Sequence, residues 1–330
     1  MNTPETTALG TPRPAVKPAV VLAVLALSSL AASLMQSLVI PIQPYLGGLL
    51  NTSEANATWV VTATLLGGAV AMPVSGRLAD LIGKKPVLVG SAIILMVGSL
   101  LCAMTSDVAP MLIGRVLQGM AMGYIPVAIS FVRELVPPKM VTNAVAIISA
   151  MLGVGGALGM PLAAWIAQDP EQWHALFWVA FGLAVAMTAG SALLLPNVKN
   201  TISGRLDWIG AIGLAIGLVA FLVGVSKGKE WGWTSGATLG AILGGIAVLA
   251  LWGAYQLRTR EPLIDLRTTA NRPVLMTNLA GVVIGFAMMA QALVIPRILG
   301  SQADWGLEQS VLATGFWMAP GGLMMMLFAP

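Results

Sequence analysis

Uninterrupted apolar stretches of about twenty residues dominate the sequence and constrain its fold more than any other feature. Each stretch is long enough to cross the hydrocarbon core of a bilayer as an α-helix, which satisfies its own backbone hydrogen bonds. Only 9% of the 330 residues are charged, which leaves too little polar surface for a soluble enzyme. Outer-membrane barrels are also disfavoured, because their strands alternate apolar and polar residues. The sequence therefore predicts an all-α polytopic membrane protein.

Charge clusters and turn residues divide the chain into about ten predicted spans. The spans cover residues 19–44, 57–76, 86–104, 110–132, 141–167, 173–195, 208–225, 236–256, 274–299 and 310–330. The Pro-rich basic stretch 1–18 is predicted to be a disordered tail. The first apolar stretch starts like a signal peptide but is too long to be one, so we interpret it as a helix. The last stretch lacks a following Lys or Arg anchor, which predicts an incomplete chain.

Basic residues gather on one side of this predicted topology. That side carries Arg13, Lys17, Arg77, Lys84, Lys85, Arg133, Lys139, Lys199, Arg205, Arg258, Arg260, Arg267 and Arg272. The positive-inside rule then predicts a cell-membrane protein with a cytoplasmic N-terminus, and it explains the net charge of +4 without nucleic acid. The single cysteine, Cys102, supports neither a disulfide framework nor a thiolate metal site.

Between the second and third predicted spans, residues 76–85 read GRLADLIGKK. Two glycines seven residues apart allow a tight reversal, and one acid among three bases allows a small charge network. An ordinary positive-inside loop is the alternative interpretation. The ordered pattern resembles the cytoplasmic loop signature of the major facilitator superfamily, and in that interpretation Asp80 with Arg77 and Lys84 latches the cytoplasmic side. The candidate residues of this gate loop are Gly76, Arg77, Asp80, Gly83, Lys84 and Lys85.

Arg115 is the only charged residue predicted to lie within the hydrocarbon. A charge there costs at least ~2.5 kcal/mol on insertion scales, so it must face the bundle interior or a wet cavity. Gln118 lies one turn further on the same face, and Gln36 of the first span is a second candidate partner. The segment resembles the second superfamily signature, which is associated with proton coupling. A purely structural arginine bonded to backbone carbonyls is the alternative.

The fifth predicted span contains closely spaced glycines before a proline: Gly155, Gly159 and Pro161. Such a helix is expected to bend and to present a flat face for close packing. It resembles the signature of superfamily antiporters, although Met160 separates Gly159 from Pro161 and Ala163-Ala164 replace a glycine pair. Ordinary glycine and proline usage in membrane helices is the alternative.

Three further motifs follow in the order typical of the fourteen-helix drug/proton antiporter family. They are Asp207-Trp208-Ile209-Gly210, Trp231-Gly232-Trp233-Thr234-Ser235 and the segment from Glu261 to Arg267. The resemblance implies a six-helix N-terminal bundle (19–196), two linker helices with flanking loops (197–272) and the start of a C-terminal bundle (273–330). It also implies proton-coupled efflux of hydrophobic or cationic small molecules by alternating access.

The sequence departs from this family in one respect that bears on mechanism. No Asp or Glu is predicted deep within any span, so the usual proton-carrying carboxylate is missing and proton coupling rests on the resemblance alone. The altered pattern in the fifth span leaves an uptake symporter for a metabolite open, and the incomplete second half leaves open a truncated chain without activity. The expected partners are a small-molecule substrate, protons and the lipid bilayer. No cofactor is expected, since the chain contains no Walker motif.

Overall fold

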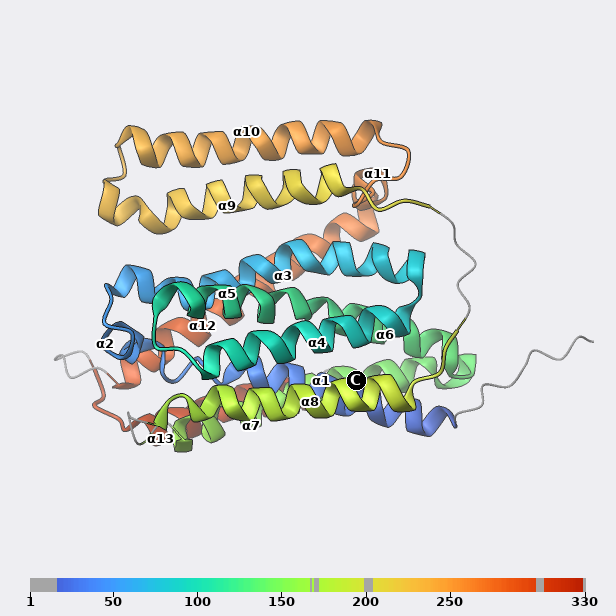
Figure 1. Cartoon of the computed structure of the whole chain (residues 1–330), viewed down its shortest axis with the longest axis horizontal. Helices are drawn as coiled ribbons and strands as arrows, with labels where there is room; N and C mark the ends of the chain where they lie inside the picture. Colours follow the sequence, from blue (N-terminus) through green and yellow to red (C-terminus); the bar gives the residue numbers. More distant parts are fainter. Residues whose placement is uncertain (1–16, 167, 169–171, 199–203, 301–305, 329–330) are drawn as a thin grey trace, which may run out of the picture.

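A computed structural model describes residues 17–166, 168, 172–198, 204–300 and 306–328, and within these ranges the chain forms helices and no strands. The long helices lie roughly side by side as a bundle (Figure 1). Of the predicted tail, residues 1–16 lie outside the described residues, as do Lys199 and the ends of two predicted spans at 167 and 329–330. Pro18 does not belong to the tail, because it is the first residue of α1.

Helices coincide with all six predicted spans of the first half. The long ones are α1 (Pro18–Ser37), α3 (Glu54–Ile82), α4 (Lys84–Ala103), α5 (Val108–Met120), α6 (Tyr124–Leu135), α7 (Val141–Ile166) and α8 (Ala175–Leu194). Short elements are η1 (Gln43–Tyr45), α2 (Leu46–Leu49), η2 (Ala121–Gly123) and η3 (Pro138–Met140). One contiguous apolar core joins these helices, with Tyr124, Phe131 and Phe177 among its largest fully buried side chains.

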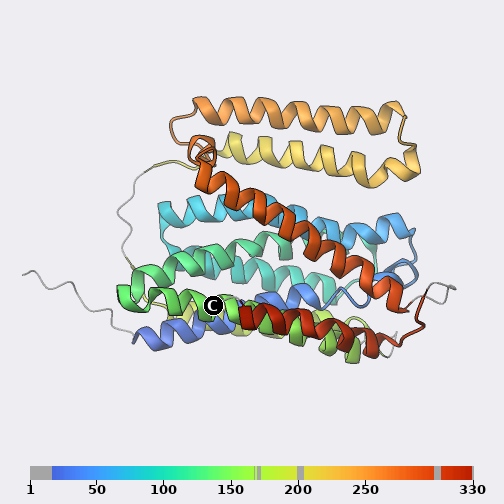
Figure 2. The same cartoon turned by 180° about the vertical axis from the view of Figure 1, so that it is seen from behind.

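The later part of the chain also matches the predicted spans. It comprises α9 (Trp208–Trp231), α10 (Gly236–Arg258), α11 (Leu266–Thr269), α12 (Arg272–Gly300) and α13 (Val311–Phe328). We call the antiparallel pair α9 and α10, together with the flanking segments 204–207 and 259–265, the linker hairpin. It lies beside α3, and α12 runs obliquely across the bundle from the end near α11 toward α13, which packs along α7 (Figures 1 and 2).

The fold class is confirmed, because eight helices in the described ranges are long and apolar enough to cross a membrane. A shorter apolar helix, Arg272–Met288, follows them. The polytopic all-α character follows from the apolar runs, whose backbone groups are satisfied within each helix.

Several helix ends differ from prediction for local reasons. The first helix ends at Ser37, well before residue 44, because Pro41 and Pro44 disfavour helical backbone in the residues before them. The fourth span breaks at η2, where Pro126 has no N–H to donate to the carbonyl of Met122. By contrast, α9 continues six residues beyond 225, to Trp231, through Lys227 and Glu230.

Candidate functional site

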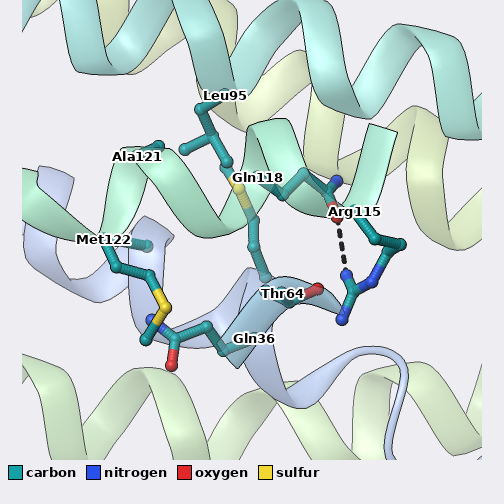
Figure 3. Close-up of a pocket in the computed structure, with 9 residues that line it drawn as sticks. Gln36, Thr64, Leu95, Arg115, Gln118, Ala121 and Met122 are labelled. Carbon is teal, nitrogen blue, oxygen red and sulfur yellow. Dashed lines mark hydrogen bonds between the residues drawn. The ribbon is translucent and has the colours of Figure 1, made fainter. Parts of the chain in front are cut away.

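Arg115 lies in α5 with 4% of its surface exposed, and its hydrogen bonds go to neutral oxygens. Its Nε donates to the carbonyl of Val60 in α3 at 2.8 Å, and its Nη1 donates to Oε1 of Gln118 at 2.6 Å (Figure 3). Nε2 of Gln118 in turn donates to Oγ of Ser99 in α4 at 2.9 Å. This chain of hydrogen bonds fixes the guanidinium between three helices.

Glycines allow the helices around Arg115 to approach so closely. A side chain at Gly119 would collide with the backbone carbonyl of Thr64 in α3. A Cβ at Gly98 in α4 would lie 2.7 Å from the carbonyl oxygen of Gly114 in α5. Small residues at such positions bring backbones into contact in membrane bundles. Because α3 and α5 touch, Arg115 can reach the Val60 carbonyl without crossing a gap.

Arg115 and Gln118 line a small cavity of about 20 Å³. Its walls come from α1, α3, α4, α5 and η2, and the lining residues are Ala32, Met35, Gln36, Thr64, Leu95, Arg115, Gln118, Ala121 and Met122 (Figure 3). A volume of this size holds about one water molecule, provided that polar partners are present. The structure thus brings Gln36 to the same cavity as Arg115, but Gln118 is the direct hydrogen-bond partner.

The acidic residues of the described ranges all lie at helix ends or in loops. Glu54, Asp80, Glu134 and Glu230 occupy first or last turns, Asp107 and Asp207 are N-cap residues, and Glu261, Asp265 and Glu308 lie between the long helices. Arg115 takes part in none of the ion pairs that these residues form. A charge held by neutral oxygens keeps a positive potential in the cavity, which favours an anionic or carboxylate group there.

The predicted gate loop is much shorter than the sequence suggested. Helix α3 continues through Arg77 and Asp80 to Ile82, and α4 begins at Lys84, so Gly83 alone makes the reversal. Gly83 has φ +98° and ψ 154°, a conformation open essentially to glycine. Gly76 lies inside α3 with open space where a Cβ would be, so of the two glycines expected to allow the reversal only Gly83 lies at the turn.

The bases of this segment form their ion pairs with acids from distant segments. Arg77 Nη2 lies 3.0 Å from Oε2 of Glu261, in the loop after α10, and Lys84 pairs with Glu134 at the end of α6. The predicted latch of Asp80 with Arg77 and Lys84 therefore omitted the two acids that these bases contact. Asp80 and Lys85 are half-buried in the same region.

The glycines of α7 face α1. A Cβ at Gly155 would meet the carbonyl of Leu30, and one at Gly159 would meet Oγ of Ser37. Ser33 Oγ also donates to the carbonyl of Leu152 across this interface at 2.6 Å. The glycine face of α7 thus packs backbone to backbone against α1.

Pro161 lies on the part of α7 that packs against α13. The helix continues past this proline to Ile166. A Cβ at Gly315 of α13 would lie 3.2 Å from the Cα of Pro161 and 2.7 Å from the Cβ of Ala164. The segment that contains Gly155, Gly159 and Pro161 therefore lies between the first helix and the last described helix.

Sequence reasoning missed Ser99, Val60, Glu134 and Glu261 as partners. A serine or a backbone carbonyl within an apolar run carries no distinguishing signal. Glu261 did stand in a family motif, but nothing in the sequence indicated which base it would meet. Contacts between residues 184 positions apart depend on how the helices pack.

Comparisons with known proteins place this geometry in a family. The sequence profile of the Major Facilitator Superfamily matches residues 25–330. A multidrug resistance protein B homolog of Mycobacterium tuberculosis (strain CDC 1551 / Oshkosh) is 28% identical over 285 residues, which are 84% of this chain and 51% of that protein. The multidrug transporter protein MdtP of Bacillus subtilis (strain 168) is 26% identical over 257 residues, 76% of this chain and 46% of that protein.

An uncharacterised MFS-type transporter of M. tuberculosis (strain ATCC 25618 / H37Rv) is 27% identical over 300 residues, 89% of this chain and 43% of that protein. The chain thus spans about half the length of the curated relatives it matches. Among solved structures, the POT family transporter PepTSo has a similar fold, with a TM-score of 0.59 and 15% identity, covering 94% of this chain and 68% of that one. These relatives are transporters, not enzymes, and the chain belongs to the Major Facilitator Superfamily.

Proposed function

We propose that the protein exports hydrophobic or cationic small molecules in exchange for protons, by alternating access across the cell membrane. The observation that carries this proposal is the buried Arg115–Gln118 pair beside a cavity lined by α1, α3, α4 and α5. Polar residues deep in a membrane bundle are costly, and they typically mark transport pathways. The printed names of two relatives, a multidrug resistance protein homolog and a multidrug transporter, support the choice of cargo.

In this proposal Arg115 is a fixed positive charge that acts on a transient partner. Its hydrogen bonds to Val60 and Gln118 hold the guanidinium at one place, so any carboxyl group that enters the cavity is favoured in its ionised form. Loss of the proton from that carboxyl group is then linked to the movement of the substrate.

The predicted division of the chain supports a rocking motion. Residues 19–196 form one half, 197–272 the linker and 273–330 the beginning of the other half. The α7 segment around Gly159 is then the sliding face, because it contacts α1 on one side and α13 on the other. Basic residues Arg77, Lys84 and Arg205 lie at one end of the bundle, which we assign to the cytoplasm together with the N-terminus.

Transport in proteoliposomes tests the proposal. The full chain is reconstituted, a pH gradient is imposed, and a fluorescent lipophilic cation is followed inside the vesicles. We expect the cation to move against the proton flow, and collapse of the gradient by an ionophore should stop it. Movement of cargo with the protons would indicate an uptake symporter instead, and equal flux in protein-free vesicles would overturn the transport function.

A further inference from the structure

The linker hairpin contacts the first-half bundle at both ends of one helix. At one end, Glu261 accepts from Arg77 Nη2 at 3.0 Å and from the backbone N–H of Arg205 at 2.6 Å. At the other end, Lys227 of α9 donates to Oδ1 of Asn56 in α3 at 2.9 Å, and it also pairs with Glu230 at 2.8 Å. Since α3 runs from Glu54 to Ile82, these contacts lie near its two ends.

An apolar contact adjoins the polar contact at the Glu261 end. Ala211, Leu214 and Leu263 form a small buried cluster of their own, and Val74 of α3 packs against it. The hairpin is therefore joined to α3 by polar and apolar contacts at the Arg77 end and by a polar contact at the Asn56 end. Asn56 and Arg77 share one helix, so any movement of α3 relative to the hairpin would disturb both ends together.

The hairpin end near Glu261 is itself tightly organised. Asp207 caps α9 by accepting from Gly210 N–H at 2.7 Å and also accepts from Gln256 Nε2 at 2.9 Å. Oε1 of Gln256 then accepts from the backbone N–H of Leu263 at 3.0 Å. Glu261, two residues before Leu263, is thereby held at a defined position against Arg77.

We propose that Glu261 is a positioning residue for the cytoplasmic gate: it holds Arg77 to the linker hairpin, so that the hairpin and the first-half bundle move as one body. The gate part of this statement rests on the proposed transport function. The docking part does not, because it follows from contacts between described residues.

Glu261 offers two features that suit this role. It accepts a charged donor and a backbone donor at once, which makes the contact stronger than an isolated surface ion pair. It is also accessible, with 47% of its side chain exposed against 22% for Arg77, so the contact can be broken and remade from the aqueous side.

Thiol labelling tests the docking part without any transport. Cys102, the one native cysteine of the sequence, is fully buried, so a cysteine introduced by Leu206→Cys reports on the hairpin face. We expect Glu261→Gln to raise its maleimide labelling rate about three- to tenfold, as expected for loss of one charge-assisted contact. Asp265→Asn is the matched control: it removes an equal charge four residues away, where, among the described residues, the carboxylate accepts from Arg267 and Thr268 of its own turn.

A double-variant comparison separates the pair from general loosening. If Arg77 and Glu261 act together, Glu261→Gln adds nothing to the labelling rate when Arg77→Gln is already present. Size-exclusion profiles confirm that each variant is folded. An unchanged rate in Glu261→Gln, a rise of equal size in Asp265→Asn, or independent effects of the two substitutions would each overturn the docking role.

The gate part is tested by flux in proteoliposomes. We expect Glu261→Gln to change the transport rate about three- to tenfold and Glu261→Asp to restore most of it, since a carboxylate returns. A purely structural residue would not show this rescue. Equal flux in wild type and Glu261→Gln would overturn the gate role, whereas absence of flux in the wild type would overturn the proposed function and leave the labelling result standing.

Discussion

Two arginines of this protein show two ways to accommodate a positive charge. Arg115 is almost fully buried and is bound by a backbone carbonyl and an amide oxygen. Arg77 lies at the end of α3, partly exposed, and is bound by a carboxylate from a segment far away in sequence. Where water is excluded, fixed neutral oxygens from neighbouring helices hold the charge. At the membrane face, an opposite charge on another element holds it, in a contact that can open.

The comparison assigns different roles to the two residues. A guanidinium fixed on several sides in a low-dielectric region keeps its position and its field. Solvent and salt screen an exposed ion pair, which therefore contributes little to stability. We infer that such a pair acts instead by controlling which elements move together. Arg115 thus suits a permanent electrostatic site, and Arg77 suits a contact that joins two elements at the surface.

Removal of Arg115 should have the largest effect. We expect Arg115→Ala to reduce cation flux by about two orders of magnitude, the size typical of losing one preorganised electrostatic donor. Membrane insertion should be retained, because the variant removes a costly charge from the hydrocarbon. Flux in proteoliposomes and membrane fractionation measure the two quantities.

The matched control for Arg115 is Arg297→Ala, an exposed arginine in the last turn of α12. It should retain near-normal flux. Wild-type flux in Arg115→Ala would show that the buried arginine is only structural, which is the alternative left by the sequence.

Packing around Arg115 can be broken without touching the charge. Gly119→Val places a side chain against the Thr64 carbonyl and should lower the free energy of unfolding by about 3 kcal/mol, the upper end of the range for overpacked interiors. Thermal unfolding in detergent gives the shift in Tm. Gly90→Val in α4 has open space around the new side chain and should change Tm much less. Equal shifts in both would contradict the close approach of α3 and α5.

The gate reversal provides a smaller effect. Gly83→Ala forces a residue with a Cβ into a glycine-only conformation, at a cost of about 1–3 kcal/mol. Gly76→Ala, in open helix, should be neutral or stabilising by up to about 1 kcal/mol. Chemical denaturation of the two variants measures both changes in the free energy of unfolding. A Gly76 variant as unstable as the Gly83 variant would restore the two-glycine interpretation.

The second ion pair at this end should contribute least. Glu134→Gln removes the partner of Lys84, and because half of the Glu134 side chain is exposed we expect a loss of about 0.2–1 kcal/mol. The difference from wild type should shrink in 1 M salt, where the Debye length is about 3 Å. A salt-independent loss would mean that the contact acts through packing and not through charge.

The sequence predicted the helices of this fold well but misplaced several of their ends. Apolar runs identify spans because the bilayer allows few alternatives. The shortening of α1 before Pro41 and the break before Pro126 follow from proline chemistry that was visible in the sequence. The extension of α3 through the charged residues Arg77 and Asp80 could not be predicted from the sequence. Polar residues are compatible both with a loop and with a helix that emerges from the membrane.

The candidate site also has features that the sequence predicted and features that depend on helix packing. Arg115 and Gln118 were predictable as a pair, since residues three apart share a helix face and a lone charge in apolar surroundings requires a partner. Gln36 was expected as a second polar partner of Arg115; the structure places it on the wall of the same cavity, and that position depends on how α1 packs.

By itself, the sequence determined that the chain lies in a lipid bilayer, the class of fold and the one charge placed within a predicted span, because these follow from hydropathy and from the cost of a charge in hydrocarbon. Only the tertiary structure decided which oxygens satisfy that charge and which acids meet Arg77 and Lys84. Such partners come from helices whose relative positions are set by small-residue contacts summed over the whole bundle. The loop after α10 shows this most clearly, since Glu261 meets Arg77 of α3 only because α9 packs between α10 and α3.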